Sequence, residues 1–139
     1  MSVERLIHAL VGVAFWIGYL AYRKPGGGAG MKAGLLISAL VGTWVPDWDL
    51  LLGIGFHRSP LTHSALPVVV VAWSTRSFSR YLIPVGFAIG VASHLFWDII
   101  FFGDVRWIPG GSLDRLFLLL NVLGLIVWAI KKEVTTLNA

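Results

Sequence analysis

Residues 46–63 read PDWDLLLGIGFHRSPLTH and combine two carboxylates, two imidazoles and a guanidinium in one short segment. These polar side chains are Asp47, Asp49, His57, Arg58 and His63. Long apolar runs lie on both sides of the segment, and ionisable groups at membrane depth are costly and usually functional. We therefore interpret residues 46–63 as the core of a metal site.

The composition predicts an integral membrane protein with one domain spanning residues 1–139. Hydrophobic residues make up 57% of the chain and charged residues only 13%, and the mean hydropathy is +0.80. Soluble domains carry about 25% charged residues, so this chain cannot form a water-compatible surface. The net charge of +4 comes from scattered bases, which argues against a nucleic-acid partner. Because there is no cysteine, disulfides and thiolate ligands are excluded.

The apolar runs predict an all-α, membrane-embedded helical bundle of about five spans. The expected spans cover residues 6–22, 33–45, 63–73, 81–102 and 116–130. Pro46 ends or kinks the second span, and residues 48–56 then form a short re-entrant or interfacial segment. The bases Arg23 and Lys24 follow the first run rather than precede it. We therefore expect a retained span instead of a cleaved signal peptide.

The charges of the loops predict the orientation of the bundle. Bases follow the first, third and last spans, at Arg23, Lys24, Lys32, Arg76, Arg80, Lys131 and Lys132. Loops 46–62 and 103–115 instead carry at least as many acids as bases. The positive-inside rule then places the N-terminus outside and the C-terminus in the cytoplasm. We expect a multi-pass protein of the inner (cytoplasmic) membrane whose site lies near the outer leaflet.

Seven side chains on this outer side are candidate metal ligands: His8, Asp47, Asp49, His57, His63, His94 and Asp98. His94 and Asp98 are four residues apart and share one helix face. Asp49 precedes three leucines, beside which an unpaired carboxylate would be poorly hydrated. Simpler interpretations stay open, namely a polar pair between helices, a solvated Asp47, an interfacial His57 and a core His8.

Imidazole and carboxylate ligands without thiolate favour zinc, with manganese or iron as alternatives. Seven candidates exceed the three or four ligands of one zinc ion, so one or two ions are expected, with Asp49 or Asp98 as a bridge. Two such ions activate water and stabilise an in-line displacement at phosphorus. We predict catalytic roles for Asp49, Asp98 and Arg58, where Arg58 holds a phosphate together with Arg106 or Arg115.

The order of these motifs resembles the YdjM-like family of small, membrane-bound, metal-dependent hydrolases. The matching elements are His8, P-D-x-D at 46–49, H-R-x-x-T-H-S at 57–64 and S-H-x-x-x-D at 93–98. The ligand order is also similar to that of zinc-dependent phospholipase C and P1-type nucleases, which are all-helical phosphoesterases. That likeness implies His8, Asp49, His63, His94 and Asp98 as direct ligands and leaves Asp47 and His57 in second place. No histidine follows Asp98, so two ions is the upper expectation.

Three classes of function stay open at this point. The first is a hydrolase that cleaves a phosphoester of a membrane lipid or lipid-linked substrate arriving from the bilayer. The second is a metal or proton carrier, which needs polar groups toward the cytoplasmic side, where residues 85–89 and 123–130 are mostly aliphatic. The third is a membrane protein with a purely structural metal. The sequence predicts no oligomeric state.

Overall fold

The computed structural model describes residues 3–76, 82–106, 108 and 112–132. Over these residues the chain is all-α, with five α-helices, two 3-10 helices and no strand. The elements are α1 (Val3–Arg23), α2 (Ala29–Trp44), η1 (Pro46–Leu52), η2 (Ile54–Phe56), α3 (Leu66–Thr75), α4 (Leu82–Phe101) and α5 (Ser112–Lys131). The all-α prediction is confirmed. Arg80, one of the loop bases, and residue 81, the expected start of the fourth span, lie outside the described residues.

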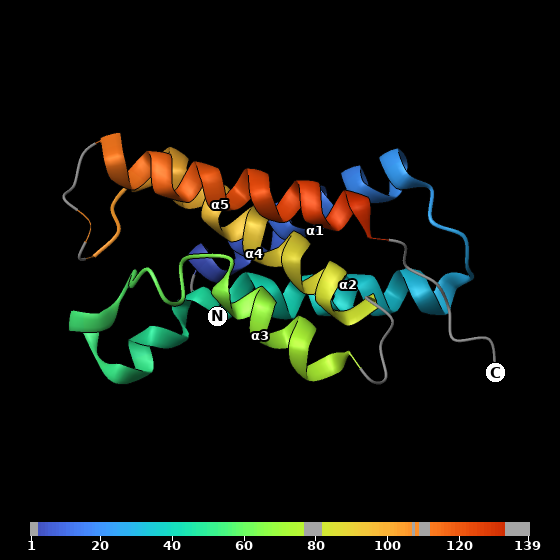
Figure 1. Cartoon of the computed structure of the whole chain (residues 1–139), viewed down its shortest axis with the longest axis horizontal. Helices are drawn as coiled ribbons and strands as arrows, with labels where there is room; N and C mark the ends of the chain where they lie inside the picture. The colour runs from blue at the N-terminus through green and yellow to red at the C-terminus, as the bar shows by residue number, and fades with distance from the viewer. Residues whose placement is uncertain (1–2, 77–81, 107, 109–111, 133–139) are drawn as a thin grey trace.

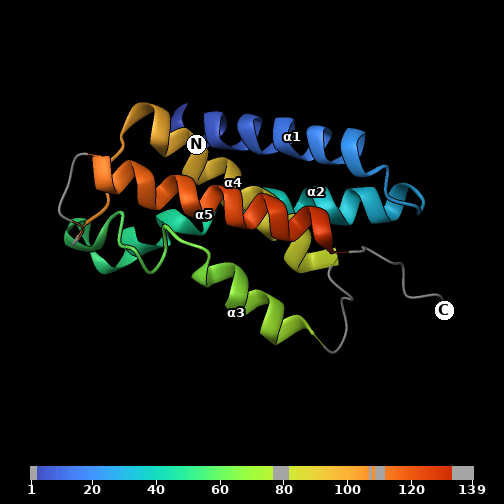
Figure 2. The same ribbon diagram turned by 45° about the horizontal axis from the view of Figure 1, so that its top comes forward.

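The five α-helices run lengthwise and alternate in direction along the chain (Figure 1). The start of α1, the segments η1 and η2, and the end of α4 lie toward one end of the molecule. The turn between α1 and α2 and the end of α5 lie toward the other end (Figures 1 and 2). This alternation explains how residues from the first, second and fourth helices meet at one end.

Helix lengths support fewer crossings than the sequence predicted. Three helices, α1, α4 and α5, are long and apolar enough to span a membrane, and α2 joined to η1 across a 42° bend is a fourth candidate. The ten residues of α3 extend about 15 Å, roughly half of a bilayer's hydrocarbon core. The predicted span 63–73 instead begins as a turn, and the helix starts only at Leu66. The described chain therefore has three to four candidate spans where five were predicted.

Helix α4 forms the centre of the bundle and packs most tightly against α2. A methyl group on Gly90 would overlap the carbonyl oxygen of Ala39, and one on Gly42 would overlap that of Phe87. At Gly86 the added carbon would lie 2.6 Å from the carbonyl oxygen of Leu35. Small residues allow this backbone contact between membrane helices. As a result, the end of α2 lies directly beside the half of α4 that carries His94.

Helices α1 and α5 lie at the periphery of the bundle. Only 17% of the apolar window of α1 and 28% of that of α5 are buried, against 72% for α4. Their exposed side chains are large and apolar, as Leu10, Ile17, Leu120 and Leu123 illustrate. A hydrocarbon environment suits such surfaces, whereas water does not. The exposure pattern therefore agrees with a membrane-embedded bundle.

Candidate metal centre

Five of the seven predicted ligands meet at one end of the bundle. They form two overlapping groups, His8–Asp47–His94 and His63–His94–Asp98, and within each group one ligand atom per residue lies within 4.8 Å of the others. His8 comes from α1, Asp47 from η1 and His63 from the turn before α3, while His94 and Asp98 come from α4. Four of these side chains are buried, and Asp47 is partly exposed.

The separations between the ligand atoms fit a shared cation. His94 Nε2 lies 3.3 Å from Asp98 Oδ2, His63 Nε2 lies 3.5 Å from the same oxygen, and His94 Nε2 lies 3.7 Å from Asp47 Oδ1. Two ligands of a tetrahedral zinc ion, each bonded at about 2.1 Å, are about 3.4 Å apart. These atoms are therefore spaced as neighbours on one coordination sphere would be.

Four nitrogen and oxygen atoms of the cluster are buried but have no hydrogen-bond partner. The unpartnered atoms of this cluster are His8 Nδ1, His63 Nε2, His94 Nε2 and Asp98 Oδ2. Each such atom costs about 1–3 kcal/mol when it is left unsatisfied, and a cation held by His63, His94 and Asp98 would satisfy three of the four.

The ring of His94 is oriented by the end of α2. Its Nδ1 lies 2.8 Å from the carbonyl oxygen of Thr43 and donates to it, so Nε2 keeps its lone pair for a metal. The carbonyl is available because α2 ends at Trp44, and the last four carbonyls of an α-helix have no partner within the helix. The glycine contacts between α2 and α4 bring these two groups together.

Asp49 lies on the far side of His63 and not among the facing ligand atoms. Its Oδ2 accepts hydrogen bonds from Thr62 Oγ1 at 2.6 Å and from Ser59 N at 3.1 Å, and its Oδ1 lies 3.2 Å from His57 Nδ1. Thr62 Oγ1 in turn lies 3.1 Å from His63 Nδ1. This series of hydrogen bonds favours the His63 tautomer that carries its proton on Nδ1, so that an unprotonated Nε2 faces Asp98.

The sequence favoured Asp49 over Asp47 as a direct ligand, whereas the structure places Asp47 in a ligand group and Asp49 outside both groups. A 3-10 helix has three residues per turn, so Asp47 and Asp49 point in different directions. Asp47 faces His94, while Asp49 faces the turn that contains His57 and Thr62. Among the described residues, Asp49 and His57 belong to neither ligand group. Their contacts suit them to orient His63 instead.

A cavity of about 370 Å³ opens onto the cluster. Its lining combines candidate ligands with charged and apolar side chains: Glu4, Arg5, His8, Asp47, Leu50, His57, Arg58, Asp98 and Phe102. Arg58 forms an ion pair with Asp104, and its guanidinium lies 3.9 Å above the centre of the Phe102 ring. A guanidinium at the rim can bind an anionic oxygen.

The arginines that line the cavity are not all the ones that the sequence predicted. The side chain of Arg106 contacts the carbonyl oxygen of Ile54 at 3.5 Å, and that of Arg115 lies against Gly103; neither lines the cavity. Arg5 does line it, although the sequence analysis did not identify it as a candidate. The signal was its spacing, since Arg5 precedes His8 by three residues and therefore shares its helix face.

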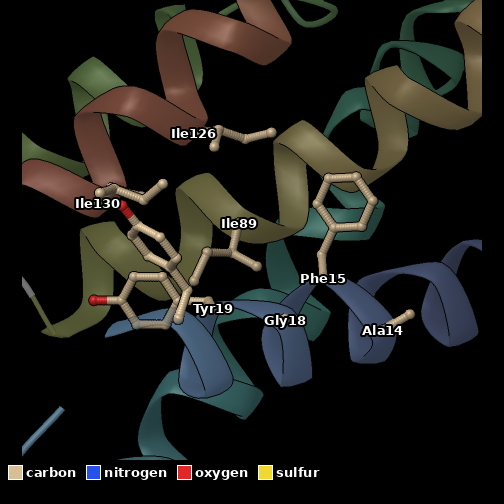
Figure 3. Close-up of a pocket in the computed structure, with 9 residues that line it drawn as sticks. Ala14, Phe15, Gly18, Tyr19, Ile89, Ile126 and Ile130 are labelled. Atoms are coloured by element: carbon tan, nitrogen blue, oxygen red, sulfur yellow. The ribbon is translucent and has the colours of Figure 1, made fainter. Parts of the chain in front are cut away.

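A second cavity, of about 360 Å³, lies between α1 and α5 over α4. Figure 3 shows the side chains of Phe15, Tyr19, Ile89, Ile126 and Ile130 around it. Apart from the hydroxyls of Tyr19 and Tyr22, its lining is apolar, and it contains none of the candidate ligands. Of these two cavities, only the first is lined by candidate metal ligands.

Comparison with known proteins agrees with the motifs and the membrane character of the chain. The family model described as YdjM inner membrane protein matches residues 3–133. No curated protein and no solved structure matches the chain, so the likeness to phospholipase C and P1-type nucleases stays a prediction. Because the family match covers nearly all of the sequence, the chain belongs to the YdjM inner membrane protein family.

Proposed function

We propose that the protein is a membrane-bound, metal-dependent hydrolase that cleaves a phosphoester of a lipid or lipid-linked substrate. The observation that carries this proposal is the set of four buried ligand atoms without hydrogen-bond partners. They lie beside a cavity whose lining includes Arg5 and Arg58. A site for a cation next to guanidinium groups suits a phosphate ester, whose oxygens both can bind.

The arrangement supports one ion, with zinc as the preferred metal and manganese or iron as alternatives. Both ligand groups share His94, whose Nδ1 faces the Thr43 carbonyl. Only Nε2 is then free to bind, and one imidazole nitrogen serves one ion. His63, His94 and Asp98 would hold the metal, with His8 or Asp47 completing the set. When bound, zinc acts as a Lewis acid and lowers the pKa of a coordinated water.

The residues around the metal have separate tasks in this proposal. Asp98 contributes a ligand oxygen, and Asp49 keeps His63 oriented through Thr62. Arg58 holds the phosphate, since a guanidinium has five N–H donors and Asp104 occupies only part of them. In the reaction, water oxygen bonds to phosphorus, the bond from phosphorus to the leaving oxygen breaks, and that oxygen takes up a proton.

The membrane placement of the site also belongs to this proposal. The loop charges place the ligand end of the bundle near the outer leaflet. The alternating helices are consistent with this placement, because they bring all the ligand-bearing segments to one end (Figure 1). A substrate would then reach the cavity from the bilayer.

The two other functions find less support. A carrier needs polar groups toward the opposite end, yet the cavity found there is lined mainly by apolar side chains (Figure 3). A structural metal needs no access from outside, yet His8, Asp47 and Asp98 line a cavity.

Elemental analysis after mild purification tests the proposal, together with release of phosphate or headgroup from phospholipids and lipid pyrophosphates. We expect about one transition-metal ion per chain and turnover that a chelator abolishes and added zinc restores. The variant Arg76→Gln, at the opposite end of α3, is the matched control and should keep both properties. Purified protein that holds no metal and takes up none on addition would refute the hydrolase.

A further inference from the structure

A third cavity adjoins the one at the metal centre. It measures about 400 Å³ and is lined by Arg5, Trp44, Asp47, Trp48, Leu50 and Leu51. Three of these residues, Arg5, Asp47 and Leu50, also line the cavity at the metal centre. The two cavities are therefore neighbours that share these three residues, and we call the pair the joined cleft.

The two halves of the joined cleft differ in chemistry. The half at the metal centre contains Arg5, Arg58 and the candidate ligands. The other half extends over Trp44, Trp48 and Leu51, of which Trp48 is 57% and Leu51 85% exposed. These side chains belong to η1 and the end of α2, at the site end of the molecule. Apolar side chains beside the polar half offer a surface on which the chain of an amphiphile can lie.

Building on the proposed function, we propose that the joined cleft binds one amphiphile, an alkyl phosphate with a monoanionic or dianionic head. The head lies between Arg5 and Arg58, and the alkyl chain lies over Trp44, Trp48 and Leu51. Arg5, which lines both halves, is the specificity-determining residue because it contacts the phosphate where the head meets the chain.

Two guanidinium groups in the lining support an anionic head. A divalent cation offsets the charges of Asp47 and Asp98, and the remaining charged side chains of the lining are Arg5, Arg58 and Glu4. Guanidinium groups bind phosphate through two parallel hydrogen bonds. The exposed Asp104 holds Arg58 at the rim and leaves other guanidinium donors to the ligand.

Size and location support an alkyl chain. Each half lies at the lower end of the range of roughly 300–1,000 Å³ that ligand pockets occupy, so neither half by itself holds a large ligand. Tryptophans gather at membrane interfaces, and the chain belongs to an inner membrane protein family. An alkyl chain entering from the bilayer would therefore replace lipid over Trp48 and Leu51.

Photo-crosslinking tests this proposal without requiring turnover. The probe is dodecyl phosphate with a diazirine near the end of its chain, added to the full-length protein in phosphatidylcholine nanodiscs with zinc. We expect crosslinks in Trp48 and Leu51, lost on competition with unlabelled dodecyl phosphate. Arg5→Gln should lower the labelling roughly tenfold, as loss of a hydrogen bond to a charged group does. Arg5→Lys should restore it only in part.

Additional variants and probes show whether the labelling depends on the joined cleft. Leu51→Asn changes a side chain that is almost fully exposed, so the fold should tolerate it while labelling falls. Arg76→Gln should label as the wild type does. The proposal is overturned if crosslinks gather instead at Phe15 and Ile126 in the apolar cavity. Equal labelling by a dodecyl trimethylammonium probe, or equal competition by inorganic phosphate, would also overturn it.

The result separates this inference from the proposed hydrolase. If the protein binds metal and hydrolyses phosphoesters but Arg5→Gln and Leu51→Asn are labelled as strongly as the wild type, the amphiphile site is refuted and the hydrolase stands. If labelling follows the expectation but no metal binds, the amphiphile site stands and the hydrolase is refuted.

Discussion

Two cavities of nearly equal size, about 370 and 360 Å³, lie toward opposite ends of the same bundle. The first holds four of the seven candidate ligands and two arginines in its lining, whereas the second is apolar apart from two tyrosine hydroxyls. Both are bounded by α1 and α4, so neither size nor the supporting helices distinguish them. The segment η1 and the turn that follows it border only the first of these two cavities, and they add Asp47, His57 and Arg58 to its lining. The other polar side chains of that lining come from α1 and α4, the same helices that present mainly apolar side chains to the second cavity.

The largest effect is expected from a substitution between α2 and α4, because α4 borders both cavities. Gly90→Ala would push α4 away from the Ala39 carbonyl and displace His94, one turn further along. Overpacking of this kind costs about 1–3 kcal/mol, so the thermal midpoint in detergent and the metal content should both fall. Gly124→Ala is the matched control, because an added carbon there meets nothing within 4 Å. An unchanged midpoint for Gly90→Ala would show that the two helices can separate freely.

A ligand substitution should abolish the chemistry of the first cavity and leave the second intact. Asp98→Asn removes the charged oxygen that faces both His63 and His94, so we expect metal content to drop below about one tenth of the wild-type value. Elemental analysis measures it, and thermal unfolding shows whether the fold persists. Asp104→Asn, an exposed acid at the same end, should keep its metal. Full metal content in Asp98→Asn would remove that residue from the site.

Smaller effects are expected from the residues that orient His63. Thr62→Val removes the hydroxyl between Asp49 and His63, and loss of such a partner typically costs 10–100-fold in metal affinity. Chelator competition measures this affinity, and Thr62→Ser should recover most of it. Asp49→Asn should weaken binding to a similar extent. If Asp49→Asn instead eliminates binding as completely as His63→Ala, Asp49 is itself a ligand.

The smallest effect is expected in the apolar cavity. Ile126→Phe adds volume beside Phe15 and Ile130 (Figure 3), far from the ligands, and should leave metal content unchanged and turnover within about twofold. Overpacking limits any loss of stability to about 1–3 kcal/mol. A strong fall in turnover with normal metal content would instead connect this cavity to the function, as a carrier would require.

Much of the site was predictable because local rules govern it. The low charge and long apolar runs require helices, since backbone groups in hydrocarbon must be bonded internally. The spacing of His94 and Asp98 places both on one face of any helix. The loop charges predicted that the ligand-bearing segments share one side, and His8, Asp47, His63, His94 and Asp98 do meet at one end.

Tertiary structure decided what depends on contacts between segments. The exchange of Asp47 and Asp49 follows from the 3-10 geometry of η1 and from the turn around Thr62, which captures Asp49. Helix α3 is short because it begins only at Leu66, after the turn whose residues contact Asp49 and position His63. Arg5 shares a face of α1 with His8, but only the packing of α1 in the bundle shows that this face lines the cavity. Sequence periodicity describes a helix face, but the partner of that face depends on how closely the backbones approach, and here glycine contacts between distant residues determine that approach.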